Sequence, residues 1–266
     1  MGWLAAFGAL VHELVGFRSH IATLFASDFT ASYRGTTLGI AWNILLPMLP
    51  VSVYVLLAKL RVFPAIEGIS PEVYIGFNIT LWFLFTGLIN HPIHVVRSRG
   101  TGAMKTAIPL SATIAASFAR LCFDTLVRVV LVALLMIATS TMPTIGTLAF
   151  VPAAFAGLVF FLGLGLALSI LNVVYPDIER VITITLQYGI FVSGVIFPIA
   201  SMGPLAMLET LNPFNVFIQA ARDLVFFGAL THPAAFFAWT IGGVLLLLFA
   251  ARLFHLTEYR IRGLAE

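Results

Sequence analysis

Charged residues are scarce in this sequence. Only 9% of its 266 residues are Asp, Glu, Lys or Arg, while 61% are hydrophobic. Soluble domains carry roughly 25% charged residues, so a water-soluble fold could not cover this much apolar surface. The apolar residues come in long unbroken runs rather than short alternating strands, which excludes a transmembrane β-barrel. The composition therefore predicts an all-α integral membrane protein with several transmembrane helices.

Cysteine is nearly absent as well. The single residue, Cys122, excludes an internal disulfide and lies in an apolar run, where it is most simply a small core residue. The formal charge of +3 does not point to nucleic acid, because in a membrane protein the placement of positive residues matters more than their sum. The first apolar stretch has no basic region before it and contains Glu13, which does not fit a cleavable signal peptide.

Two kinds of chemical site are also missing from the sequence. The phosphate-binding pattern G-x-x-x-x-G-K-[ST] has no match, and the dipeptide Gly-Lys never occurs. Any ATP chemistry must therefore come from another chain, and we expect this chain to bind no cofactor and to hold no catalytic residue. His91 and His94 flank Pro92, but a metal site needs further ligands, so we interpret them as interfacial histidines and expect no metal.

Six segments reach the roughly 20 apolar residues that a membrane span needs. They are about 37–59, 73–96, 112–138, 148–174, 180–200 and 234–254. The stretch 3–25 instead has apolar residues at helical spacing that charged residues interrupt, which predicts an amphipathic helix in the membrane interface. We expect one domain, with the interfacial helix and a junction in 1–36, the spans in 37–254 and a cytoplasmic tail in 255–266.

An even number of spans places both termini on one side of the membrane. Nine Lys or Arg residues fall on that side and three on the opposite side, which predicts cytoplasmic termini by the positive-inside rule. The nine are Arg18, Arg34, Arg97, Arg99, Lys105, Arg180, Arg252, Arg260 and Arg262, and the three are Lys59, Arg61 and Arg222.

Residues 201–233, between the last two spans, form an external segment that is moderately apolar and broken by Pro204, Pro213 and Pro233. Its two pieces of about ten residues are too short to span a bilayer. We therefore predict a re-entrant segment, whose helices enter the membrane from outside and return. Irregular backbone at that depth needs a covering of protein or a water-filled cavity, so this segment is expected to help close a pathway.

Three charged residues interrupt the third span. Arg120, Asp124 and Arg128 are spaced four residues apart, which places them on one helix face with the acid between the two bases. Charges at membrane depth normally face the bundle or a cavity. They form either a mutually neutralised ladder that fixes helix packing, which we favour, or a polar strip on a translocation path.

Aromatic side chains are abundant, and two interpretations of them are open. Such residues most often form the interfacial belt or the core. Aromatic faces also stack on sugar rings, whose axial C–H bonds are apolar. We prefer the second interpretation at Phe197, which directly precedes Pro198 and the broken segment. The candidates for substrate contact are Trp82 in the second span, Tyr188, Phe191 and Phe197 in the fifth, and Phe214 after the Asn-Pro break.

Three stretches make the chain resemble a known family. They are "SDFTASYRGTTLGIAWNILLPML", "VYPDIERVITITLQYGIFVSGVIFP" and "LNPFNVFIQAARDLVF". In this order and spacing they resemble the membrane subunits of ABC-2 type exporters of polysaccharides and polyol phosphates, which include O-antigen, teichoic-acid and capsule exporters. The resemblance covers essentially the whole chain. Two departures are a weakly basic loop at 97–111 and Pro176, where the family often has Arg before Asp177.

The resemblance implies a half-transporter in a bacterial inner membrane. Two copies would form the channel as a homodimer, and two separate ATPase subunits with their ATP and magnesium would bind beneath it. The N-terminal helix and the loop 97–111, with Arg97, Arg99 and Lys105, would receive the movement of the ATPase. The substrate would be a glycan polymer on an undecaprenyl-pyrophosphate-type lipid, moved outward.

The motif Tyr-Arg-Gly-x-x-Leu-Gly-x-x-Trp at 33–42 marks a candidate substrate contact at the inner leaflet. Arg34, with Tyr33, Gly35 and the backbone N–H groups at the start of the first span, would bind the pyrophosphate, and Trp42 completes the motif. The alternative is that Arg34 only anchors the helix to lipid phosphates.

Two other classes of function fit the sequence less well. A membrane-embedded transferase would need acidic or histidine groups gathered on one aqueous face, and Asp28, Asp177 and Glu179 are dispersed in the sequence. A secondary transporter would show inverted repeats, and the sequence has no convincing internal symmetry.

Overall fold

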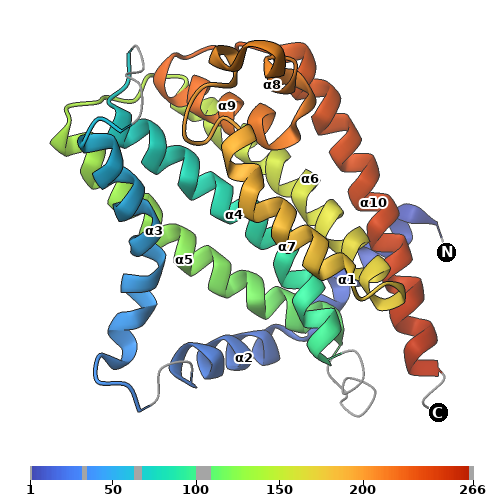
Figure 1. Ribbon diagram of the computed structural model, residues 1–266. Helices are drawn as coiled ribbons and strands as arrows, with labels where there is room; N and C mark the ends of the chain where they lie inside the picture. Colours follow the sequence, from blue (N-terminus) through green and yellow to red (C-terminus); the bar gives the residue numbers. More distant parts are fainter. Residues whose placement is uncertain (1, 32–34, 63–67, 100–108, 264–266) are drawn as a thin grey trace.

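The computed structural model describes residues 2–31, 35–62, 68–99 and 109–263, and every regular element within these ranges is a helix (Figure 1). Five of the described helices contain segments long and apolar enough to cross a membrane. They are α3 (Trp42–Lys59), α4 (Pro71–Arg99), α5 (Leu110–Ala138), α6 (Thr147–Val174) and α10 (Pro233–Gly263). The shorter ones are α1 (Trp3–Gly16), α2 (Arg18–Ala31), α7 (Ile178–Gly189), α8 (Leu208–Leu211) and α9 (Pro213–Phe226). The described ranges also contain the short 3₁₀ helices η1 (Gly39–Ala41), η3 (Ile190–Val192) and η4 (Ile199–Leu205).

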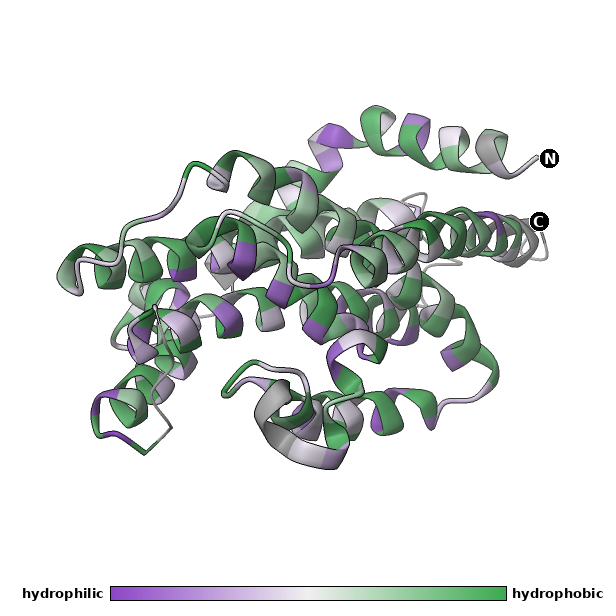
Figure 2. Cartoon of the chain, turned by 90° about the horizontal axis from the view of Figure 1, so that it is seen from above, coloured by the Kyte–Doolittle hydropathy of each residue, from purple (hydrophilic) through white to green (hydrophobic). Residues whose placement is uncertain are grey.

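The N-terminal stretch is two helices, so the prediction of one helix over 3–25 is wrong. The break falls at Phe17, whose backbone angles (φ −97°, ψ 16°) leave the helical region directly after Gly16. Glycine is a poor helix former, which favours an interruption at this point. Helix α1 then packs against α10, whereas α2 packs across α5. Seen from above, α1 lies along the outside of the bundle (Figure 2).

Helices α4 and α6 form the centre of the bundle. About 72% of the apolar stretch of α4 is buried inside the protein, against 17% for α3 and α5. Small residues on α6 let the helices approach closely: a Cβ on Gly165 would lie 2.2 Å from the carbonyl oxygen of Leu88. Hydrophobic association between helices is weak in lipid, so such close backbone packing carries much of the stability.

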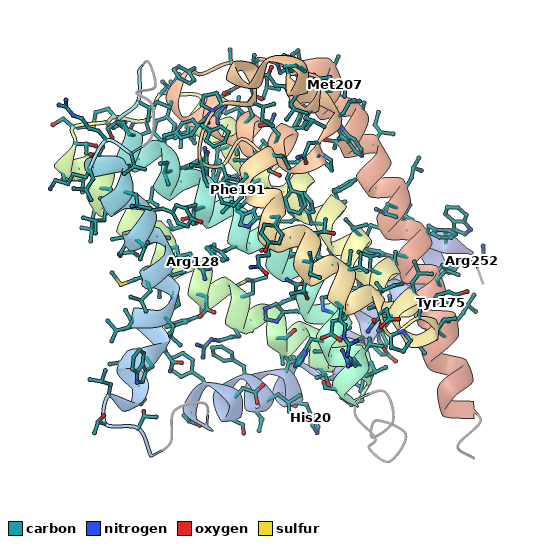
Figure 3. All side chains as sticks on the ribbon, viewed as in Figure 1. His20, Arg128, Tyr175, Phe191, Met207 and Arg252 are labelled. Atoms are coloured by element: carbon teal, nitrogen blue, oxygen red, sulfur yellow. The ribbon has the colours of Figure 1, made fainter. Side chains whose placement is uncertain are left out.

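The fifth predicted span, 180–200, is not one continuous helix. It consists of the twelve-residue α7 and η3, followed by an irregular stretch. Gly194 is a key residue of this irregular stretch, because it adopts φ +66° and a Cβ there would lie 2.1 Å from Oδ1 of Asn215. A helix of twelve residues rises only about 18 Å, less than the hydrocarbon thickness of a bilayer. The chain nevertheless runs from Tyr175 at one end of the bundle to Met207 at the other (Figure 3). The count of six spans therefore stays a prediction.

The broken segment predicted at 201–233 is present as separate pieces. Asn212 ends α8 and caps α9, since its side chain accepts a hydrogen bond from the backbone N–H of Phe214 and Pro213 occupies the first turn. Helix α9 packs against α4, α6 and α10. Whether this segment re-enters a membrane from outside stays a prediction.

Candidate functional site

Two of the predicted substrate-contact aromatics lie together in the core. The rings of Trp82 and Phe214 are 4.6 Å apart, and Phe214 in turn lies 4.3 Å from Phe161 of α6. Only 4% of Trp82 is exposed. This aromatic cluster fills the centre of the bundle between α4, α6 and α9. In a single chain, the geometry of Trp82 and Phe214 is that of core packing.

The other aromatic candidates lie on or near α7. Tyr188 is 63% exposed and Phe191 is 47% exposed, so both point away from the bundle of this single chain. Figure 3 shows Phe191 at the upper end of α7. Phe197 is partly buried against the main core. The structure thus separates these five aromatics into an internal pair, an exposed pair and one residue at the edge of the core.

The motif at the inner leaflet is described only in part. Tyr33 and Arg34 lie outside the described residues, as does Lys105, and the side chain of Arg99 does too. Gly35 is exposed and adopts φ +83°, a left-handed conformation that favours glycine. Trp42 is half-buried at the first residue of α3.

Arg97 pairs within its own chain. Its guanidinium donates a hydrogen bond to Oε2 of Glu179 at the start of α7, and Nδ1 of His94 lies 3.8 Å from Oε1 of the same carboxylate. The backbone N–H of Glu179 donates to the buried side chain of Asn172, which fixes the turn between α6 and α7. We name these four residues the Glu179 clip. It joins the end of α4 to the α6–α7 turn.

The charged ladder of α5 makes contacts that hold other helices. Arg120 donates to Asp124 (3.0 Å) and to Oδ1 of Asn43 on α3 (2.7 Å). Arg128 donates to the carbonyl oxygen of Pro47 and lies over the ring of Phe83, 4.8 Å from its centroid. Figure 3 shows Arg128 between α5 and α3. These contacts favour the packing interpretation over a polar strip on a path.

A second polar network, at the opposite end of the bundle from the Glu179 clip, was not anticipated from the sequence. Arg222 of α9 donates to the hydroxyl of Tyr74, and that hydroxyl donates to the carbonyl oxygen of Gly194. Asn78 donates to the same carbonyl and to that of Val195. The network fixes the irregular chain after η3 against α4. Polar residues inside the apolar run of α4 were the one available signal, since Arg222 was interpreted only as a charge on the outer side.

Among the residues that the structure describes, no three His, Cys, Asp or Glu side chains gather as a metal site would require. Of the acids near the predicted inner surface, Glu179 is held in the clip, whereas Asp177 is exposed, with its carboxylate 3.8 Å from Arg180.

Comparisons with known proteins agree with this architecture. The family model described as "ABC-2 type transporter" matches residues 19–226, a range that begins in α2 and ends with α9. The O-antigen export system permease protein RfbA of Myxococcus xanthus is 23% identical over 221 residues, which cover 82% of this chain and 84% of that protein.

Proposed function

Since this chain belongs to the ABC-2 type transporter family, we propose that it is the membrane-spanning permease subunit of an exporter that moves a lipid-linked, O-antigen-type polysaccharide across the inner membrane. It would act as a homodimer with two separate ATPase subunits, which bind the ATP and magnesium. Both termini would lie in the cytoplasm. The resemblance expected from the three sequence stretches is confirmed by the family match.

The observation that carries the substrate proposal is the similarity to an O-antigen permease along most of both chains. Capsular polysaccharide and teichoic acid are the alternative cargoes in the same class of transport. A polysaccharide also suits the exposed aromatic side chains of Tyr188 and Phe191, because aromatic faces stack on the apolar faces of sugar rings.

The packed interior supports a pathway between two copies. The cluster around Trp82, Phe161 and Phe214 fills the centre of one bundle, so a polymer has no room along that line. Helix α3 exposes an apolar face at Leu45, Leu49 and Val53. We place the conduit where such exposed faces of two chains meet, with Phe197 and the segment 201–233 near its outer end.

The Glu179 clip supports a coupling role for the loop 97–111. This loop begins at Arg97, and the ion pair between Arg97 and Glu179 ties its first residues to the α6–α7 turn. A movement of the ATPase against Arg99 or Lys105 would then displace α4 and α7 together. Arg97 itself would position this surface through Glu179.

The proposed lipid-pyrophosphate contact at Tyr33, Arg34 and Gly35 is the sharpest point to test. The chain is produced together with its ATPase partner and reconstituted in vesicles, and ATP hydrolysis is measured with and without lipid-linked glycan. We expect the glycan to stimulate hydrolysis, and Arg34→Ala to abolish that stimulation and export while the complex still assembles. Arg34→Lys should retain only part of the stimulation and export, because lysine cannot make the planar bidentate contact.

The matched control is Lys59→Ala, which removes an exposed positive charge at the other end of α3. It should leave stimulation unchanged. Full export by Arg34→Ala would overturn the pyrophosphate contact. Failure of the chain to associate with any ATPase in mild detergents would overturn the exporter itself and favour a membrane-embedded transferase.

A further inference from the structure

Two neighbouring hollows form one groove on the side of the bundle that α1 borders. The larger, of about 820 Å³, lies between α4, α5, α6 and α10, and the smaller, of about 200 Å³, lies between α1, α5, α6 and α10. Phe7, Phe118, Leu162 and Leu247 line both, so the hollows are adjacent and we treat them as one groove. The groove extends along α5 from Val129 to Ser111, a rise of about 27 Å.

The wall of this groove is hydrocarbon almost throughout. Its lining comes from the membrane-spanning stretches of α4, α5, α6 and α10, together with one face of α1. The hydroxyl of Thr125, one of the few polar groups there, is already bound to the carbonyl oxygen of Leu121. An empty space of this size would forfeit dispersion contacts along its whole wall. In a bilayer, the acyl chains of lipids can fill it.

The groove has a polar end with a definite charge. Ser111 lines the smaller hollow, and its hydroxyl donates to Oε2 of Glu13 on α1 (2.8 Å). This serine is the one hydrogen-bond partner of the Glu13 side chain within the described ranges, so Oε1 has the capacity to accept from a second donor. Glu13 is half-buried. A carboxylate bonded to a residue that lines an apolar groove favours a cationic donor and disfavours an anion.

Positive side chains near Glu13 do not alter its preference for a cationic headgroup. Arg252 lies over the ring of Trp3, ten residues before Glu13 and so about 15 Å away along α1. Arg18 is exposed and close to Glu13 in the chain. It suits a phosphate, but every phospholipid carries one. Glu13 is therefore the group that distinguishes between headgroups.

We propose that the groove binds a phospholipid whose headgroup ends in a primary ammonium, of the phosphatidylethanolamine class, with its acyl chains along α5 and its ammonium on Glu13. The lipid fills the space between α1 and the bundle. Helix α1 otherwise rests mainly on α10, through Trp3 against Phe249 and the buried Ala6. The bound lipid therefore fixes the N-terminal helix in place.

Lipid exchange on the purified full-length protein tests this site. Delipidated protein in nanodiscs of equal phosphatidylethanolamine and phosphatidylglycerol content is released into detergent, and the lipids it retains are counted by native mass spectrometry. We expect phosphatidylethanolamine to be retained about tenfold over phosphatidylglycerol, as one charge-assisted hydrogen bond would give. Equal retention of the two lipids by the unaltered protein would overturn the proposal.

Two pairs of variants separate the headgroup from the chains. Glu13→Gln should remove the preference while lipid is still retained, and Ser111→Ala, which keeps the carboxylate, should preserve it. Val129→Phe narrows the groove and should reduce retention of both lipids, whereas Val130→Phe, on the neighbouring exposed position outside the lining, should not. Unchanged headgroup preference in Glu13→Gln, or unchanged retention in Val129→Phe, would contradict the assignment.

Discussion

Asn43 joins three helices through a single amide. It is completely buried, its Nδ2 donates to the carbonyl oxygen of Phe29 on α2, and its Oδ1 accepts from Arg120 on α5. Pro47 follows one turn later on α3 and accepts from Arg128. The position of α3, and of the motif at its start, thus depends on these polar side chains as well as on the apolar contacts of Val51 and Ala58 with the core.

Replacing Asn43 by alanine should lower the free energy of unfolding by about 1–3 kcal/mol, because it leaves the Phe29 carbonyl and Arg120 without this partner in a buried site. The matched control is Ile44→Ala, at an adjacent position that is 49% exposed and faces away from these partners. Thermal unfolding of both variants in the same detergent measures the difference. Equal midpoints would mean that the Asn43 bonds do not contribute to stability.

At the residue scale, the sequence predicted which residues lie together on one helix, but it did not predict their contacts with other helices. Four-residue spacing correctly placed Arg120, Asp124 and Arg128 on one face, because helix geometry fixes that relation locally. It could not show that Asn43 and Pro47 accept hydrogen bonds from Arg120 and Arg128, since those contacts join residues about 80 positions apart. The burial of Trp82 could not be predicted either, because it depends on packing against Phe214, which lies on a helix distant in the sequence.

At the scale of helices, α6 is shaped by its small residues. Gly165 faces the backbone of α4 at Leu88, and Gly157 faces the ring of Phe85. These positions permit the close approach of the two central helices. The carbonyl oxygen of Leu88 cannot move away as the end of a flexible side chain could, so Gly165 leaves no room for substitution.

Gly165→Ala should therefore force α6 away from α4 and destabilise the protein by about 1–3 kcal/mol, as overpacking typically does. Gly242→Ala on α10 is the comparison, because a Cβ there would meet nothing within 4 Å. That variant should be neutral or slightly stabilising, since alanine is the better helix former. The measurement is the unfolding midpoint of each, and a loss of stability of similar size in both would contradict the packing argument.

Hydropathy predicted five long helices, because a run of 20 apolar residues leaves few alternatives in a membrane, although α10 continues to Gly263, past the predicted end at 254. It failed over 180–200, a mostly apolar run in which α7 ends at Gly189, and Gly194 and Pro198 follow in an irregular stretch. It also merged α1 and α2, since helical periodicity does not show a turn of one residue at Phe17. Apolar composition indicates that a segment lies in the membrane, while its conformation depends on helix-breaking residues and on packing.

At the scale of the whole molecule, the orientation in the membrane is the main prediction that charge placement makes. The α5–α6 connection should face outward and the α6–α7 turn should face the cytoplasm. Ile145 and the side chain of Asp177 are 89% and 88% exposed at these two places, so both positions accept a probe.

Cysteine labelling in a Cys122→Ala background measures this orientation. Ile145→Cys should react with a membrane-impermeant maleimide in intact cells, and Asp177→Cys should react only after the membrane is opened. The background variant without a new cysteine is the control for non-specific labelling. Labelling of Asp177→Cys in intact cells would reverse the predicted orientation of the termini.

The sequence predicted which residues are candidates for the site, but it did not predict how they are arranged in space. Tyr188 and Phe191 lie on the outer face of one chain, so any role in transport depends on what a second copy or the substrate places against them. The Glu179 clip was likewise hidden, because Arg97 and Glu179 are 82 residues apart and only the fold joins them.

Helix α9 has a consequence for how the protein is made. Twelve consecutive residues, Asn215–Phe226, are buried, and Gln219, Arg222 and Asp223 are among them. Hydrocarbon disfavours such side chains when they have no partners, so α9 is a poor candidate for entering the bilayer by itself. We therefore expect α9 to dock onto α4 and α6 only after these helices are inserted. Variants that slow this late step of biogenesis would lower the yield of the protein through proteolysis of the nascent chain, while the molecules that complete it would transport normally.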